Sequence, residues 1–299
     1  MKSILSRDEK IFARASAVIL AVFALITFSP FILIAISSIS STQSLAYRGY
    51  SFFPESLSLD SYIYMVAQGK MILRSYSVSL FVTFVGTITS LIITPLLAYP
   101  LSRKDFKLRN LFTFLVFFSL LFNGGVVPSY IMWAKYLSLK NTIWALIFPT
   151  YLMNGFNVIL VKNYFERNVP KDLIEAAQID GANELTIFSK VMIPLSTPVI
   201  ATIGMFTGLA YWNDWINGLY YISDPALYGV QQLLIRILSN IAFLRSGAAA
   251  SVVGNITISL PGDSIRMALA IIGILPILIV FPLLQKYFIR GIVIGAIKG

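Results

Sequence analysis

Long apolar runs recur along this chain, separated by shorter polar segments. Six of them are long enough to cross a hydrocarbon core, which needs roughly 20 apolar residues of helix. They cover residues 12–39, 78–101, 111–134, 142–161, 195–221 and 267–287. The pattern predicts an all-α polytopic membrane protein with six transmembrane helices. No stretch remains for a separate soluble domain, so we expect the whole chain to form a single transmembrane domain, residues 1–299.

The composition fits a protein whose solvent is a bilayer. Hydrophobic residues make up 57% of the chain and charged residues 12%, a balance too apolar for an ordinary soluble domain. The chain has no Cys and no His, which excludes thiol nucleophiles, imidazole bases and the commonest zinc ligands. A nucleotide-binding loop of the Gly-x4-Gly-Lys-Ser/Thr kind is also missing from the sequence. We therefore expect no catalytic residue, no metal site and no ATPase site in this chain.

The net charge of +10 is best interpreted through the placement of the basic residues. With the N-terminus inside, most of the 23 Lys and Arg residues fall in the short inner segments. The positive-inside rule then favours both termini in the cytoplasm, and this bias explains the charge better than nucleic-acid binding does. Three longer connections result, an inner one at 162–193 and two outer ones at 40–77 and 222–266.

The inner connection carries the most informative pattern. Pro170 suits a first helical position, and Gly181 suits the left-handed turn that closes a short helix. A second short helix is expected to follow, with Leu185, Phe188 and Met192 spaced to share one face. The sequence thus predicts a helix, a turn and a helix beneath the membrane.

This helical segment is better suited to docking than to catalysis, because its carboxylates have no catalytic partner nearby. Ala176 and Ala177 permit close backbone approach, and Glu175, Asp180 and Glu184 are placed to pair with basic residues of a partner. The alternative is an amphipathic helix lying on lipid, although anionic headgroups favour a more basic helix. The pattern alone leaves both interpretations open.

The stretch "EAAQIDGANELTIFSKVMIP" resembles the cytoplasmic EAA motif of permeases in binding-protein-dependent ABC importers. That motif reads Glu-Ala-Ala, three residues, Gly, nine residues, then Ile-x-Leu-Pro. The residues that match it in register are Glu175, Ala176, Ala177, Gly181 and Pro194. Val191 and Ile193 replace Ile and Leu, which changes only apolar shape.

The resemblance covers nearly the whole chain and points to the oligosaccharide branch, with subunits such as MalG of the maltose importer. "YWNDW" at 211–215 and "RGIVIGAIKG" at 290–299 both resemble that branch. "NGGVVPSY" at 123–130 is similar to a group within it that handles complex polysaccharide fragments, to which alginate-importer permeases belong. The resemblance implies the transmembrane domain of a type I ABC importer in the bacterial inner membrane.

It also implies a coupling helix that is seated in a cleft of an ATPase subunit. The expected coupling residues are Asp172, Glu175, Ala176, Ala177, Asp180, Gly181 and Pro194. Closure of two ATPases, which use ATP and Mg²⁺, would move this helix and switch the membrane helices between inward-facing and outward-facing states. The other implied partners are a second homologous permease subunit and an extracytoplasmic solute-binding protein, for which the outer segments are the natural docking surface. No cofactor is expected on this chain itself.

Asp214 is the only carboxylate inside a predicted span, and an intramembrane charge marks a candidate functional site. Counting ~1.5 Å per residue from the start of its span places it near the outer surface. We therefore expect a water-facing or sugar-facing acid rather than a proton relay. Sugars stack on aromatic rings and bond to amides and carboxylates, which makes Trp212, Asn213 and Asp214 candidate substrate-path residues; an aromatic belt at the headgroups is the alternative.

Asn123 is the fourth candidate for the substrate path. With Gly124 and Gly125 it interrupts the third predicted span. Such an interruption lines a cavity or, equally, forms a notch for helix packing.

Two other function classes are polytopic as well. An ion-coupled secondary transporter usually carries several ionisable residues deep in the membrane, and they are missing from these apolar runs. A membrane enzyme needs paired carboxylates or a metal cluster at one interface, whereas helical spacing spreads Glu175, Asp180 and Glu184 around the helix axis. The importer permease remains the favoured function.

Overall fold

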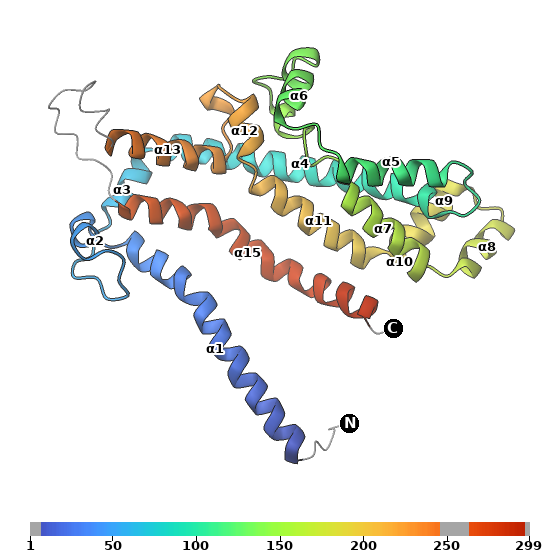
Figure 1. Ribbon diagram of the computed structural model, residues 1–299, viewed down its shortest axis with the longest axis horizontal. Coiled ribbons are helices and arrows are strands. Elements are labelled where there is room, and N and C mark those ends of the chain that lie inside the picture. Colours follow the sequence, from blue (N-terminus) through green and yellow to red (C-terminus); the bar gives the residue numbers. More distant parts are fainter. Residues whose placement is uncertain (1–6, 246–262, 297–299) are drawn as a thin grey trace. The chain divides into compact units, whose positions relative to one another are not determined.

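The computed structural model describes residues 7–245 and 263–296 of the chain. These residues are nearly all helical (Figure 1), and their only β feature is an isolated bridge between Ser40 and Leu57. The predicted all-α class is therefore confirmed. The chain divides into two compact units, Met1–Gly69 with Ile237–Leu275, and Lys70–Arg236 with Pro276–Gly299. Residues 246–262 of the predicted outer segment 222–266 lie outside the described residues.

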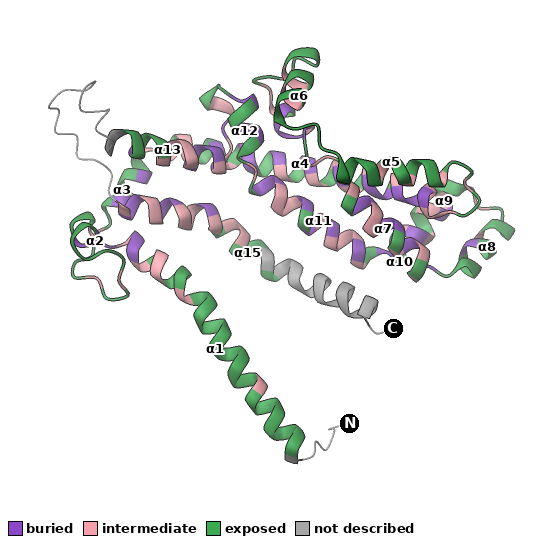
Figure 2. Cartoon of the chain, in the orientation of Figure 1, coloured by how far each residue is buried: buried purple, intermediate pink, exposed green. Residues whose placement is uncertain are grey.

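The first unit contains the long helix α1 (Arg7–Ser38), the short helices α2 (Thr42–Arg48) and α3 (Asp60–Ala67), and the start of α15 (Asp263–Ala296). Along most of its length α1 is exposed on all sides (Figure 2). A helix that is apolar all round and exposed along most of its length is suited to contact with lipid or with other membrane helices.

Hydroxyl groups hold the C-terminal end of α1, the short helices and the start of α15 together. Ser61 Oγ donates to Ser264 Oγ over 2.8 Å, and Thr42 Oγ1 lies 3.2 Å from the same oxygen. Ser38 Oγ and Tyr62 OH are 2.8 Å apart and connect the end of α1 to α3. These bonds fix the start of α15 against the segment that follows α1.

The second unit is built on α4 (Gly69–Ser102) and α11 (Thr197–Trp212). Its other helices are α5 (Arg109–Leu121), α6 (Val126–Tyr130), α7 (Gly155–Asn168), α8 (Lys171–Ile179), α9 (Glu184–Ile187), α10 (Ile193–Leu195) and α12 (Ile216–Tyr221). The helix α13 (Val230–Arg245) begins in this unit and ends in the first. The six-residue stretch Ile131–Tyr136 and the five-residue stretch Phe188–Met192 are π-helical, and Ile143–Leu146 and Pro225–Leu227 are 3-10 turns.

The best-packed core lies where α4, α7 and α11 meet the segment that contains α8 and α9. Leu101 of α4, Val161 of α7 and Ile203 of α11 are each 1% exposed or less, as is Ile187 of α9. Between membrane helices such contacts stabilise the fold by van der Waals packing rather than by removing apolar surface from water. The helices beneath the predicted coupling segment are therefore held as one packed body.

The predicted spans agree only partly with the observed helices. Among the described residues three helical stretches are long and apolar enough to cross a membrane, Asp8–Ser38, Gly69–Ser102 and Asp263–Val280. Two bent pairs also have the required composition, Arg109–Leu121 with Val126–Tyr136 at 113°, and Glu184–Leu195 with Thr197–Trp212 at 80°. The count is thus three spans, or up to five if each bent pair is one span. The single transmembrane domain stays a prediction.

The expectation of one helix over residues 142–161 is wrong. After the 3-10 turn the chain runs through turns and bends from residue 147 to residue 154. Thr150 has a φ of 72°, and the Asn154 side chain accepts the N–H groups of Phe156 and Asn157 to begin α7. Hydropathy detects the apolar content of such a run but not the helix start that an Asn N-cap creates inside it.

Gly86 marks the closest approach of α4 and α11. A Cβ at this position would collide with the ring of Tyr211, which is buried and whose hydroxyl donates to the Ile147 carbonyl over 2.7 Å. At Gly208 the nearest atom to a built Cβ is Thr87 Oγ1 at 3.5 Å, an ordinary contact. The two glycines therefore differ in the space around them.

We expect Gly86→Ala to destabilise the membrane domain by about 1–3 kcal/mol, the usual range for overpacking a core. Gly208→Ala is the matched control, and it should be neutral or stabilising, because alanine favours helix over glycine by about 1 kcal/mol. Thermal unfolding of the purified protein in detergent compares the two variants. If Gly208→Ala lowered the stability as much as Gly86→Ala or more, the close contact between Gly86 and the Tyr211 ring would not explain the effect.

Candidate coupling segment

The predicted coupling helix is α8, and its ends show how the sequence shapes it. Pro170 is the N-cap, with φ −62° and ψ 133°, so the helix begins one residue later than expected, at Lys171. The narrow range of φ that proline allows suits both the N-cap and the first helical position. At the other end Gly181 has a φ of 77°, which confirms the predicted left-handed turn.

Two backbone bonds close α8 in a Schellman motif. Ala182 N donates to Ala177 O over 2.9 Å, and Gly181 N donates to Gln178 O over 3.0 Å. A residue with a Cβ is disfavoured in this turn, because the left-handed conformation costs about 1–2 kcal/mol outside glycine. The turn redirects the chain from α8 into α9, whose N-cap Asn183 accepts the N–H of Thr186 over 2.8 Å.

One face of α8 packs against the protein and the other is exposed (Figure 2). Ile174 is buried at 9% exposure, and Ala177 packs with Ala182 against the same core. On the outer face the apolar side chains of Leu173 and Ile179 are 46% and 86% exposed. Large apolar side chains on a short exposed helix of this kind are typical of a surface that docks a partner.

The expected coupling residues lie mostly on that exposed face. Those exposed to solvent are Asp172, Glu175, Ala176, Asp180, Gly181 and Pro194. Ala177 is partly buried and supports the helix from below. The structure thus brings three carboxylates and a small residue onto one surface of α8 and its turn, whereas Pro194 lies in α10.

One expectation for the second helix is wrong. Leu185, Phe188 and Met192 do not share one face, since Leu185 is 69% exposed and Met192 is 1% exposed. The π-helical stretch Phe188–Met192 changes the residue spacing on which that expectation rested. The residue buried in place of Leu185 is Ile187.

Glu184 makes contacts within the chain. Its Oε2 accepts a short hydrogen bond from the Tyr99 hydroxyl of α4. Its Oε1 lies 3.6 Å from Arg103 Nη2 and accepts from Gln178 Nε2 over 3.5 Å. Glu184 therefore connects α9 to α8 and to the C-terminal end of α4, and its pairing with basic residues of another subunit stays a prediction.

The loop that joins α4 to α5 completes this arrangement. Arg103 forms two bonds to the Asp105 carboxylate, each 3.1 Å long. The guanidinium of Arg103 lowers the pKa of Asp105 below its ordinary value. Since a carboxyl with a lowered pKa loses its partner only when the pH falls through that pKa, this pair persists at neutral and mildly acidic pH.

A charged hollow of about 570 Å³ lies between this loop, the end of α7 and α8. Its basic lining residues are Arg103, Lys104, Arg109 and Lys171, and its acidic ones are Asp105, Glu166 and Glu175. Glu175 thus lies at the rim of the hollow and on the exposed surface of α8.

Glu166, which lines the hollow, also connects two helices. Its Oε1 lies 2.6 Å from Arg109 Nη2 of α5 and 3.1 Å from Lys162 Nζ of α7. The Lys162 side chain is 10% exposed and the other two are 25% exposed. Sequence reasoning missed this cluster, although the i,i+4 spacing of Lys162 and Glu166 on one helix is a recognisable signal.

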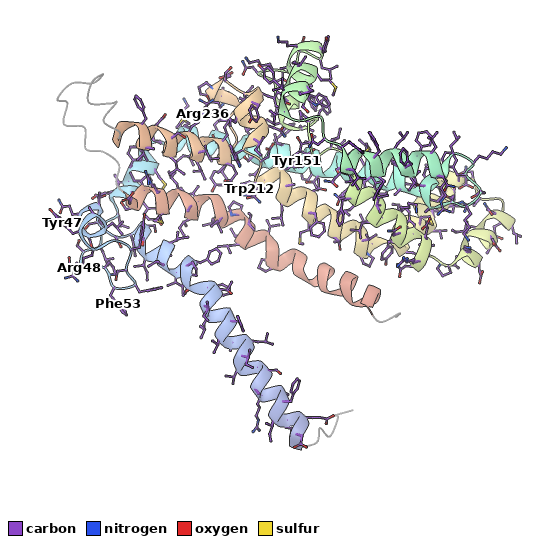
Figure 3. The ribbon with its side chains drawn as sticks, in the orientation of Figure 1. Tyr47, Arg48, Phe53, Tyr151, Trp212 and Arg236 are labelled. Carbon is purple, nitrogen blue, oxygen red and sulfur yellow. The ribbon has the colours of Figure 1, made fainter. Side chains whose placement is uncertain are left out.

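The candidate substrate-path residues are placed differently from the expectation. Asp214 caps α12, because its Oδ1 accepts the N–H groups of Ile216 and Asn217 at 3.1 Å and its Oδ2 accepts from Asn217 Nδ2 at 2.7 Å. Trp212 (Figure 3) is 4% exposed, and its ring centroid lies 5.9 Å from that of Tyr76. These contacts give both residues structural roles, so a sugar-facing role for them stays a prediction.

The other two substrate-path candidates, Asn213 and Asn123, have more accessible side chains. Asn213 is exposed and donates to Leu209 O over 2.9 Å. Asn123 is exposed and accepts the N–H of Gly125 over 2.8 Å, in the turn between α5 and α6. The predicted interruption of the third span at Asn123 is present, whereas its role as a cavity lining stays a prediction.

Comparison with known proteins places this geometry in a family. Residues 7–294 match the model of the binding-protein-dependent transport system inner membrane component. Protein LplC of Bacillus subtilis (strain 168) is 41% identical over 92% of this chain and 90% of its own length. The polygalacturonan/rhamnogalacturonan transport system permease protein YtcP of the same organism is 38% identical over 94% of this chain and 96% of its own length.

A solved structure is similar over almost the same extent. It is the crystal structure of a bacterial ABC transporter involved in the import of the acidic polysaccharide alginate, with a TM-score of 0.76 and 31% sequence identity. The match covers 96% of this chain and 100% of the other chain. At that identity and coverage the likeness extends to the type I importer fold. This chain therefore belongs to the family of binding-protein-dependent transport system inner membrane components, as a permease subunit of an ABC importer.

Proposed function

We propose that this permease imports oligosaccharides released from acidic polysaccharides. Two similar proteins support the substrate class, since one carries polygalacturonan and rhamnogalacturonan in its name and the other belongs to an importer of alginate. These polymers share uronic acid units, although their backbones differ. The shared feature, a chain of sugar rings that carries carboxylates, is the substrate we assign.

The observation that carries the mechanism is the two-faced geometry of α8. Its inner face is fixed in the core by Ile174, and its outer face presents Asp172, Glu175 and Asp180 with Leu173 and Ile179. A partner with basic side chains around an apolar cleft fits this surface. We infer that the partner is an ATPase subunit, and that ATP and Mg²⁺ act there and not on this chain.

The remaining parts of the assembly follow from the same proposal. The α8 side and both termini face the cytoplasm, and the outer segments 40–77 and 222–266 receive the solute-binding protein. A second, homologous permease subunit and a second ATPase complete the importer, with lipid around the membrane helices. In this arrangement the chain couples the ATPase subunits to the passage of the saccharide and carries out no chemical step itself.

Uptake into proteoliposomes tests the proposal. The permease is reconstituted with the ATPase, second permease and binding protein that co-purify with it, and tritiated tetragalacturonate is the probe. We expect uptake with enclosed ATP and Mg²⁺ and only background uptake without ATP, even under a proton or sodium gradient. Uptake driven by an ion gradient alone would contradict the ATP-driven mechanism, and uptake of maltotetraose alone would contradict the acidic substrate.

A further inference from the structure

A second hollow, of about 280 Å³, lies away from the coupling segment. It is formed by the irregular stretch before α7, by the first turn of α7 and by the middle of α11. Its principal lining residues are Tyr151, Asn154, Phe156, Asn157, Phe206 and Thr207. Figure 3 labels Tyr151, whose ring lies edge-on to Tyr211 at 5.5 Å.

The hollow lies well inside the thickness of the membrane. Thr207 is ten residues along α11 from its first residue Thr197, which places it ~15 Å from that end. Asn157 Nδ2 donates to Thr207 Oγ1 over 3.3 Å, so the start of α7 lies at the same level. With the start of α11 taken as the edge of the hydrocarbon core, which is about 30 Å thick, the hollow lies roughly half-way across it.

The backbone beside the hollow is not helical. Residues 147–154 form turns and bends between the 3-10 turn and α7. Irregular backbone at this depth is tolerated only where protein buries it or where it lines a water-filled cavity, because lipid offers no hydrogen bonds. The Asn154 side chain is exposed here. An exposed amide on irregular backbone at this level identifies the hollow as part of an aqueous path and not as a surface for lipid.

The lining has the chemistry of a saccharide contact. Phe156 and Phe206 are 58% and 39% exposed, and aromatic faces stack on the C–H faces of sugar rings. Asn154 uses its Oδ1 to cap α7, accepting from Phe156 N at 2.9 Å and Asn157 N at 3.3 Å. Its NH₂ group is the part of this side chain that can donate to a sugar hydroxyl.

Among the described residues, those that line this hollow carry no charge. A carboxylate at this depth would require a cation or several strong donors, whereas rings and amides suit hydroxyls and C–H faces. The hollow is therefore suited to the ring faces of an oligosaccharide, and the acidic groups of such a chain must be recognised by other parts of the assembly.

We propose that this hollow is a saccharide-binding station in the translocation path, with Phe156 as its stacking surface and Asn154 as its hydrogen-bond donor. The inference rests on the proposed function, since it assigns a place within this subunit to the transported saccharide. It also explains why the run at 142–161 is not one helix: the break exposes polar groups at the level where the path needs them.

Photo-crosslinking tests the position of the site. A benzophenone side chain is introduced at Phe156, and separately at Phe117 of α5, which is 51% exposed and lies outside the hollow. The full importer, reconstituted with ATP, is illuminated during uptake of tritiated tetragalacturonate. We expect labelling at position 156 to exceed that at position 117 by about tenfold. Equal labelling at both positions, or labelling at 117 alone, would overturn the proposal.

Substitution tests the stacking role. We expect Phe156→Ala to lower uptake of tetragalacturonate and of any accepted neutral oligosaccharide about fivefold to tenfold, since loss of an aromatic contact is of that order. Phe117→Ala is the control and should leave uptake unchanged. If the wild-type importer takes up saccharide, but position 156 is not crosslinked and Phe156→Ala does not lower uptake, the site is refuted and the proposed function stands. If the wild-type importer takes up no saccharide, the proposed function is refuted.

Discussion

Replacing Glu175 with lysine should abolish ATP-driven uptake while the membrane domain still folds. Glu175 is exposed on α8 and forms part of the charged rim, so a lysine there costs little within this chain. In the assembly it meets the basic partner surface that we propose, and a lost charge pair with like-charge repulsion weakens such contacts by about 2–5 kcal/mol. This corresponds to a loss of at least ~30-fold in affinity for the ATPase.

The measurements are the amount of ATPase that co-purifies with the variant, the ratio of ATP hydrolysed to saccharide imported, and thermal unfolding of the membrane domain. Asp8→Lys is the matched control, because it introduces the same change in charge at an exposed residue of α1, outside the coupling segment. If Glu175→Lys retained normal assembly and uptake, the docking role of α8 would have to be abandoned.

Replacing Glu166 with leucine should destabilise the membrane domain strongly. The variant leaves Arg109 and the buried Lys162 without their shared carboxylate. Removing one partner of a fully buried ion pair costs about 3–5 kcal/mol, and the partial exposure of these side chains reduces the expected loss to about 2–3 kcal/mol. We expect thermal unfolding in detergent to show this loss together with reduced assembly.

Glu55→Leu is the control, because it shows whether the burial of an ion pair or the distance between its charged atoms determines its contribution to stability. The Arg48–Glu55 pair has the same 2.6 Å separation as Arg109–Glu166, but its side chains are 66% and 50% exposed. An exposed pair contributes about 0–1 kcal/mol. Equal losses in Glu55→Leu and Glu166→Leu would mean that burial does not set the strength of the Glu166 cluster.

The sequence predicted the features that depend on local chemistry. The apolar runs located α1, α4 and α15, and Gly181 was correctly assigned to a left-handed turn, because only residues without a Cβ accept that φ readily. The motif around Glu175 identified the family before any contact was known. The exposed outer face of α8 then followed from the same few residues.

Features that depend on distant partners could not be predicted. The contact of Glu184 with Tyr99 joins residues 85 positions apart, so the local pattern around Glu184 gave no sign of it. The role of Asp214 was predicted from its depth in the span alone. In the structure its carboxylate accepts hydrogen bonds from the N–H groups at the start of α12. The break inside 142–161 had a local signal, since Asn154 followed by Gly155 is a common turn pair, but the apolar content of the run concealed it.

The bond between Glu184 and Tyr99 has a mechanical consequence. It ties the coupling segment to the inner end of α4, a single helix of 34 residues that is ~51 Å long. A tilt of only ~5° about one end moves the other end of a rod of that length by ~4 Å. In the coupling mechanism proposed above, a displacement of α8 would therefore pull on α4 through Tyr99, and a tilt of this helix would move its far end, at Gly69.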